Sequence, residues 1–105
     1  MSVEDGLVFR WSGEYFGFRR GGYLFDAAGR YRGWLSDEGA VWRADGRFLG
    51  ELVDGEYILR RAHMYEPQPR VPRLAPLPPI PPIPPIPRIP RIPRLGWADA
   101  LDAFP

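Results

Sequence analysis

The residue types that could act as nucleophile or general base are few and scattered. His63 is the only histidine in the chain of 105 residues. Ser12 and Ser36 lie in stretches that favour turns, Ser2 lies at the start of the sequence, and none has a histidine near it. Nucleophilic catalysis by serine needs a base held against the hydroxyl. The sequence therefore predicts no catalytic serine or histidine.

The carboxylates offer acid–base or metal chemistry only at first sight. Asp45 and Asp54 come directly before a glycine and Asp26 comes three residues before one, in turns where aspartate commonly bonds its own backbone. No spacing of His, Asp and Glu matches a metal-ligand pattern, and cysteine is absent. We expect no enzyme activity, no catalytic residue, no metal or other cofactor and no small-molecule substrate.

A proline, arginine and isoleucine triplet is the most regular feature of the sequence. Proline favours polyproline II, a left-handed helix with three residues per turn, so residues 69–95 are expected to form a rod with three faces. One face is an aliphatic stripe of Val71, Leu74, Leu77, Ile80, Ile83, Ile86, Ile89, Ile92 and Leu95. A second face is almost entirely proline. The third carries Arg70, Arg73, Pro76, Pro79, Pro82, Pro85, Arg88, Arg91 and Arg94.

The aliphatic stripe is predicted to be the binding surface, because so long an exposed apolar patch is unusual on a monomer. It could pack on its own domain, on another protein or on a second copy. The predicted contact residues are Leu77, Ile80, Ile83, Ile86, Ile89 and Ile92, with Arg88, Arg91 and Arg94 beside them and Trp97 as an anchor. The alternative is that the arginine face binds nucleic acid or another anionic surface. Residues 73–79 also match the ligand pattern of SH3-type domains.

Length bears on where the rod lies. At about 3.1 Å per residue its stripe, from Val71 to Leu95, is roughly 75 Å long, whereas a globule of about 62 residues is roughly 27 Å across. The rod must therefore wrap around its own domain or extend along several others. Wrapping is favoured, because the apolar outer face of the preceding hairpins needs a cover.

The elements before the rod follow from glycine spacing. Glycines recur every seven to ten residues in turn contexts, and the runs between them are rich in aromatic and β-branched residues. The runs repeat every 16 or 17 residues. Alignment places Val8, Leu24, Val41 and Ile58 at one position, and Phe9, Phe25, Trp42 and Leu59 at the next. We expect about seven or eight short antiparallel strands with pseudo-four-fold repetition, an aromatic core that includes Phe25, Trp42 and Phe48, and tight bends at Gly17, Gly33 and Gly50.

This pattern of aromatic strand, glycine turn and Gly-x-x-x-Gly return, followed by proline and arginine triplets and a late tryptophan, resembles small bacterial proteins with a four-fold β-flower domain. The resemblance implies an all-β fold and no activity. The fourth repeat departs from it, since "YILRRAHMYEP" lacks a second Gly-x-x-x-Gly and leaves closure of that unit open.

The chain is expected to comprise a hairpin-repeat domain (1–66), the polyproline II segment (67–95) and a short amphipathic anchor (96–105). In the anchor, Trp97, Ala100, Leu101 and Phe104 fall on one face of a short helix or turn. With no cysteine, no secretory signal and no long apolar run, a cytoplasmic protein without a membrane span is expected. Its function is predicted to be a structural or protein-interaction module.

Overall fold

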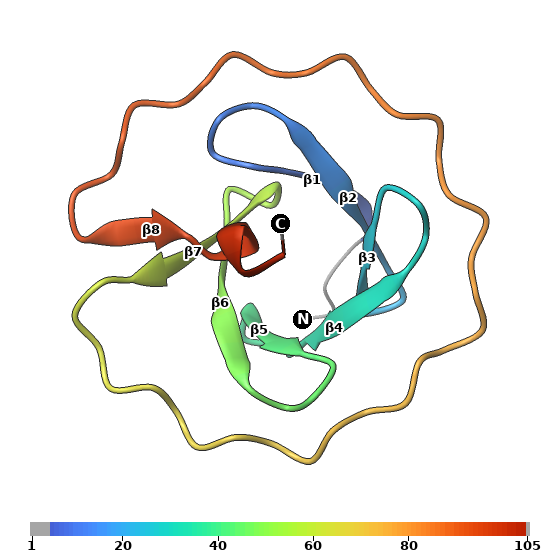
Figure 1. The fold of residues 1–105 in the computed structure, drawn as a ribbon, viewed down its shortest axis with the longest axis horizontal. Coiled ribbons are helices and arrows are strands. Elements are labelled where there is room, and N and C mark those ends of the chain that lie inside the picture. The colour runs from blue at the N-terminus through green and yellow to red at the C-terminus, as the bar shows by residue number, and fades with distance from the viewer. Residues whose placement is uncertain (1–4, 105) are drawn as a thin grey trace.

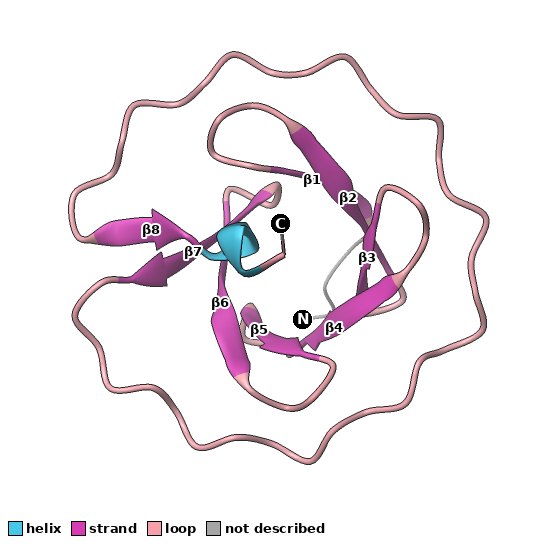
Figure 2. Cartoon of the chain, viewed as in Figure 1, coloured by secondary structure: helices cyan, strands magenta, loops and turns pink. Residues whose placement is uncertain are grey.

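The computed structural model describes residues 5–104, which form one curled antiparallel sheet (Figure 1, Figure 2). Its strands are β1 (Gly6–Phe9), β2 (Tyr15–Arg20), β3 (Tyr23–Asp26), β4 (Tyr31–Leu35), β5 (Ala40–Arg43), β6 (Phe48–Val53), β7 (Tyr57–Arg61) and β8 (Trp97–Asp99), followed by the 3-10 helix η1 (Ala100–Ala103). Each strand pairs with the next one in the chain. The predicted all-β meander is therefore confirmed.

Consecutive strands make four hairpins around a common centre: hairpin 1 (β1–β2), hairpin 2 (β3–β4), hairpin 3 (β5–β6) and hairpin 4 (β7–β8) (Figure 1). In the first three, the register shifts at the same repeat position, next to Gly17, Gly33 and Gly50. A Cβ at any of these glycines would overlap the backbone of the following strand. Their expected role at a tight bend is thus explained by close backbone approach.

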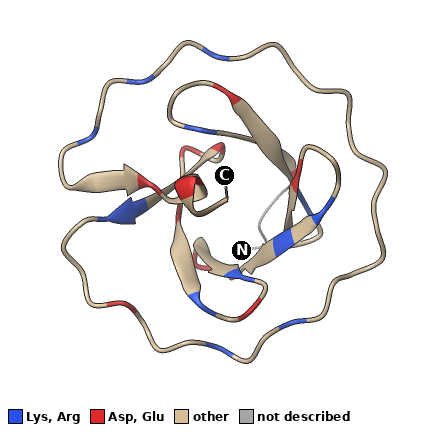
Figure 3. Ribbon diagram, viewed as in Figure 1, with Lys and Arg blue, Asp and Glu red and all other residues tan. Residues whose placement is uncertain are grey.

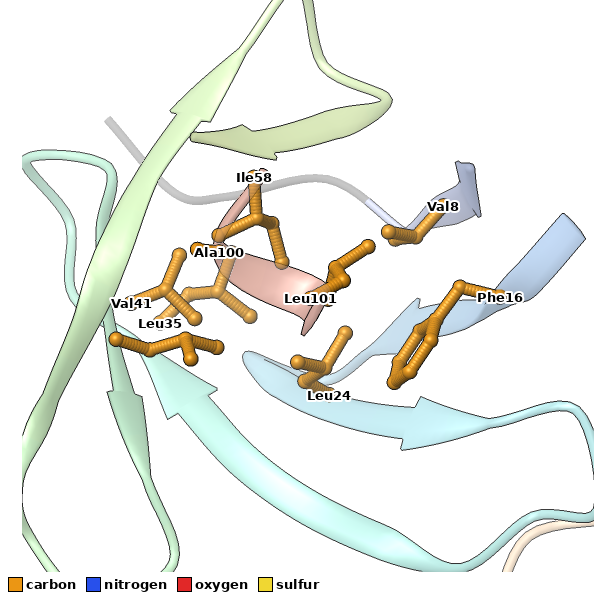
Figure 4. Close-up of a cluster of buried hydrophobic side chains, with 9 residues drawn as sticks. Val8, Phe16, Leu24, Leu35, Val41, Ile58, Ala100 and Leu101 are labelled. Carbon is orange, nitrogen blue, oxygen red and sulfur yellow. The ribbon is translucent and has the colours of Figure 1, made fainter. Parts of the chain in front are cut away.

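The repeat positions aligned in the sequence form two buried layers. Val8, Leu24, Val41 and Ile58 are fully buried and point to the centre of the curled sheet, where Leu101 of η1 packs among them (Figure 4). Their sequence neighbours point to the outer side and are also buried. These outer residues are Phe9, Phe25, Trp42 and Leu59. The predicted burial of Phe25, Trp42 and Phe48 is confirmed.

Residues 62–96 run as an extended chain that encircles the four hairpins, and we call this segment the ring (Figure 1). The path from Arg61 to its sheet partner Trp97 is about 36 residues, which at roughly 3.1 Å each gives a circumference of roughly 110 Å and a diameter of roughly 36 Å. The molecule measures 36 × 35 Å across its two longer axes. The ring therefore wraps the domain of its own chain, which is the arrangement that the apolar outer face of the hairpins favoured.

The ring is also the connection inside hairpin 4. β7 ends where the ring begins, and β8 returns from the ring to pair with β7 through Arg61 and Trp97, Arg60 and Ala98, and Leu59 and Asp99. Sequence reasoning left closure of the fourth repeat open because its second strand lies more than thirty residues away. The missing half of that repeat is supplied by residues after the ring.

The residues after the ring differ in detail from the expected single helical face. Trp97 belongs to a strand and is partly exposed, whereas Ala100 and Leu101 of η1 are buried in the central core and Phe104 packs against it. Asp99 caps η1 by accepting a hydrogen bond from the Leu101 N–H at 3.0 Å. This segment thus completes the core as well as pinning the end of the ring.

Candidate functional site

The ring presents the same one of its three faces to the hairpins all the way round. The partly buried ring residues are Met64, Pro67, Pro76, Pro79, Pro82 and Pro85, which share one register of the three-residue period. Arg70, Arg73, Arg88, Arg91 and Arg94 lie in that register too. We call it the inward face. It is the arginine and proline face of the predicted rod, and it covers the outer aromatic layer.

At hairpin 3 the ring is held by two arginines three residues apart. The Arg70 N–H donates to the Gly46 carbonyl at 2.8 Å, and the Arg73 N–H donates to the Ala44 carbonyl at 3.3 Å. Their guanidinium groups stack on tryptophans. The Cζ atom of Arg70 lies 4.5 Å from the centroid of the Trp42 indole, and that of Arg73 lies 4.7 Å from the centroid of the Trp34 indole in hairpin 2. Such stacking stabilises a cation against an aromatic face.

Hairpin 1 repeats this arrangement with Arg88 and Arg91. Their N–H groups donate to the carbonyls of Gly13 at 2.7 Å and Trp11 at 3.0 Å. Arg88 stacks on Phe9 at 4.5 Å, while Arg91 stacks on Trp11 at 4.6 Å and on Tyr57 of hairpin 4 at 5.1 Å.

Ion pairs and a further side-chain bond add to the contacts at hairpin 1. Arg88 pairs with Glu56 at 2.8 Å, and Arg91 pairs with Asp54 at 3.0 Å. The hydrogen bond from Arg91 to Asp54 raises the pKa of the arginine further. The Trp11 indole donates to the Ile92 carbonyl at 2.9 Å.

At hairpin 2 the ring lacks both arginines. The residues at the equivalent places are Pro79 and Pro82, which have no N–H to donate. This arc is held instead by side chains of the domain, through a bond from Arg20 Nη1 to the Ile80 carbonyl at 2.9 Å. Pro79 and Phe25 line the same hollow of about 300 Å³ between ring and hairpin. Proline therefore takes the place that arginine occupies elsewhere.

The aliphatic stripe faces away from the domain, which corrects the expectation that it packs on its own domain. The ring does wrap, but the exposure of its stripe runs from 83% at Val71 to 96% at Leu95. The predicted contact residues Leu77, Ile80, Ile83, Ile86, Ile89 and Ile92 are 86–91% exposed. The stripe does not pack on its own chain. The tips of the hairpins present backbone carbonyls and aromatic faces. These groups suit the N–H and guanidinium groups of arginine better than they suit an isoleucine side chain.

The other predicted contact residues are used within the molecule. Arg88 and Arg91 make the contacts described above, and Arg94 stacks on Trp97 at 4.7 Å, with Arg61 at 5.1 Å from the same indole. The ring arginines form two separated groups, at its beginning and its end (Figure 3). The SH3-type pattern also loses its basic residue, because Arg73 is stacked on Trp34.

The hairpin side of these contacts was not predicted. The ring is received by Trp11, Trp34, Gly13 and Gly46. The glycines were expected only as turn formers, and no role was predicted for the two tryptophans. One signal was available. Arg70, Pro79 and Arg88 are spaced by nine residues, and Gly46, Gly29 and Gly13 recur once per hairpin, so one ring arc serves each hairpin.

A polar hollow of about 360 Å³ lies between hairpins 1 and 2, next to the C-terminal residues. Four of its charged groups have partners: Asp26 pairs with Arg30 at 2.8 Å and with Arg32 at 3.1 Å, and Arg10 donates to the carbonyls of Leu101 and Phe104. Glu14 also lines the hollow. Burial tends to raise the pKa of Asp26, but the hydrogen bonds and charges of the two arginines outweigh it and lower that pKa. The Asp26 pairs stabilise hairpin 2 internally, and the Arg10 bonds tie hairpin 1 to the C-terminal residues.

Within residues 5–104, no group of three or more His, Asp or Glu side chains could hold a metal ion. None of the helical structure described is long and apolar enough to cross a membrane. No family model matches the chain, and neither a curated protein nor a solved structure matches it.

Proposed function

We propose that the protein is a non-enzymatic interaction module whose binding surface is the aliphatic stripe of the ring. The observation that supports this proposal is the concentration of exposed apolar side chains at one register. Among residues 5–104, the exposed large hydrophobic side chains are those of the stripe together with Tyr65, which continues the same three-residue period. An apolar surface of this size on a small domain is typical of a protein contact.

The ring turns the aliphatic stripe outward along its whole length. A polyproline II helix has three residues per turn, so fixing one face against the domain leaves the other two faces pointing outward on either side of it. The inward face is fixed by the arginine contacts at hairpins 1 and 3. The stripe is consequently a continuous apolar band, held in shape before any partner arrives. A preformed surface avoids part of the entropy cost of binding.

The competing function, binding of nucleic acid through the arginine face, receives less support. The five ring arginines stack on aromatic side chains, and two of them also pair with acids. A polyanion would have to compete with Glu56 and Asp54 for Arg88 and Arg91. If it binds, its affinity should fall steeply with added salt.

The experiment is site-specific photo-crosslinking in cells and in purified protein. A photoreactive residue replaces Ile83 on the stripe, and the matched control carries it at the tip of the turn between β4 and β5, at Glu38. We expect crosslinks to protein from Ile83, lost when Ile80 and Ile86 are changed to glutamine, and none that depend on the stripe from Glu38.

Each crosslinked protein is then purified and its affinity for the parent chain measured by calorimetry. The mass of the parent in solution is measured in parallel, since a second copy is also a candidate partner. A parent that is monomeric at high concentration and gives no stripe-dependent crosslink contradicts the proposal. Salt-sensitive binding of DNA or RNA, with no crosslink to protein, supports the competing function instead.

A further inference from the structure

We infer that the tips of hairpins 1 and 3 are binding sites for arginine-containing polyproline II segments, and that the ring is the ligand they hold in the same chain. This inference concerns the inner side of the ring and is independent of the function proposed for its outer side. The ligand class is a segment with arginines at positions i and i+3 and proline between them.

The first support is that one chain contains this site twice. Hairpins 1 and 3 are separated by 33 residues, yet both accept two N–H groups from an Arg-x-x-Arg segment at the turn glycine and at the residue two places before it. In both, the first arginine stacks on the repeat-equivalent aromatic, Phe9 or Trp42. In both, the second stacks on an aromatic of the adjoining hairpin, Tyr57 or Trp34. A chance contact would not recur with the same groups in the same order.

The second support is that the site is shaped for backbone contact. Gly13 and Gly46 have φ of 95° and 92°, and a Cβ at either position would overlap the carbonyl of Arg88 or Arg70. Glycine is therefore needed both for its own conformation and for room for the ligand backbone. The aromatic faces that receive the first arginine are buried in the complex with the ring, with Phe9 1% exposed and Trp42 4% exposed.

Third, these contacts restrict which segments can bind. The two N–H donors and the two guanidinium groups come from the same pair of residues, so proline is excluded at i and i+3. Only a three-residue period brings both of these residues to one face. Hairpin 2 fits this rule, because Pro79 and Pro82 cannot donate and make no such backbone bonds there. The site therefore recognises Arg-x-x-Arg in an extended, proline-rich segment.

The ring keeps these sites occupied in the intact chain. A tethered segment competes at an effective concentration of about millimolar. A free peptide with the same contacts should bind poorly to the parent and should bind well once the ring arginines at one hairpin are removed. This competition gives the test.

The test uses the full chain with Arg88→Ala and Arg91→Ala, and a synthetic peptide of sequence IPRIPRIP. Binding is followed by the NMR signals of the Gly13 amide and the Trp11 indole. We expect saturable shifts with affinity at least tenfold higher for the double variant than for the parent, since two guanidinium stacks are worth about that factor. Arg94→Ala, which changes only the contact with Trp97, should behave as the parent.

Two control peptides define the specificity. One carries glutamine in place of both arginines, and the other moves the second arginine by one residue so that the two no longer share a face. Both should lose at least tenfold in affinity. A folded double variant that shows no shift at millimolar peptide, or that binds the glutamine peptide equally well, overturns the inference.

If the double variant does not fold, Arg70→Ala with Arg73→Ala provides the same test at hairpin 3, read from the Gly46 amide. Arg91→Ala alone is the mildest form of the test at hairpin 1. The same two outcomes decide the inference for each variant.

Discussion

Replacement of Ile80, Ile83 and Ile86 by glutamine should leave the free energy of unfolding of the monomer almost unchanged. These side chains are 86%, 91% and 87% exposed, so only about a tenth of each is covered. Full burial of an isoleucine contributes about 1.5–3 kcal/mol. The three together therefore contribute less than about 1 kcal/mol, against roughly 4.5–9 kcal/mol if they were packed.

The measurement is thermal and denaturant unfolding followed by circular dichroism, at a protein concentration where the parent is monomeric. A loss of 1 kcal/mol corresponds to a shift of roughly 4–8 °C in Tm for a domain of this size, so the triple variant should melt within about 5 °C of the parent. Leu24→Ala, at a fully buried position of the central core, is the control and should cost about 2–5 kcal/mol. A triple variant as unstable as Leu24→Ala would show that the stripe faces the domain, and would refute the assignment of the inward face.

Four further outcomes are expected. Trp42→Ala should cost about 3–5 kcal/mol, because it removes a buried indole and the surface on which a ring arginine stacks; a parent-like melting curve would contradict this. Gly39→Ala should lower the free energy of unfolding by about 1–2 kcal/mol because of its positive φ. Gly46→Ala should cost about 1–3 kcal/mol more, because it also displaces the Arg70 carbonyl and breaks a hydrogen bond with the ring. Equal losses in denaturant unfolding would show that the ring contact is dispensable. The pKa of Asp26 is lowered by its two arginines, so its contribution to stability is complete above the ordinary carboxylate pKa of about 3.9 and is lost as pH falls through the folded value. Asp26→Asn should therefore flatten the fall in Tm between about pH 5 and 2. An unchanged slope would assign that fall to other groups. A chain ending at Glu66 should lack a cooperative transition by circular dichroism, because it loses β8 and the leucine at the centre of the core; a cooperative melt would show that the first hairpins fold alone.

The hairpins could be predicted because their information is local. Glycines at turn positions set the lengths of the strands, and alignment of the repeats identified both buried layers, from Val8 to Ile58 and from Phe9 to Leu59. The inner residues are buried in one cluster with the equivalent residues of the other repeats. The outer residues are buried by aromatic neighbours and by the ring, as Trp42 is by Phe48 and Arg70. Periodicity within one sequence is sufficient to recognise such an arrangement.

The orientation of the ring could not be predicted in the same way. The triplet shows three faces, but choosing the inward one requires knowing what the hairpin tips offer. The sequence left open whether the aliphatic stripe packs on its own domain or on a partner, and favoured its own domain because the outer face of the hairpins needs a cover. Carbonyls of Gly13 and Gly46 and the flat faces of Phe9 and Trp42 bind arginine instead, and this depends on how widely the hairpins splay in three dimensions.

The second strand of hairpin 4 was hidden by sequence distance. Trp97 pairs with Arg61 across the whole ring, so a search for repeats every 16 or 17 residues does not reach it. A short amphipathic helix or turn was expected after the ring, and η1 is one, with Ala100 and Leu101 buried and Asp102 and Ala103 exposed. Because Trp97–Asp99 form a strand and a tight turn follows it, Leu101 lies at the centre of the core. A helix that starts at Trp97 would not have to place Leu101 there.

The match of nine ring residues to each hairpin constrains how such a protein can change in evolution. Duplication or loss of one hairpin alters the circumference that the ring must span, so it has to be accompanied by gain or loss of nine residues in a distant part of the gene. Insertion of three residues keeps every side chain on its face but moves all later arginines away from their hairpins. Insertion of one residue exchanges the faces. Variation in the ring should therefore occur mainly by substitution within the triplets, and changes in its length should come in blocks of nine together with a whole hairpin.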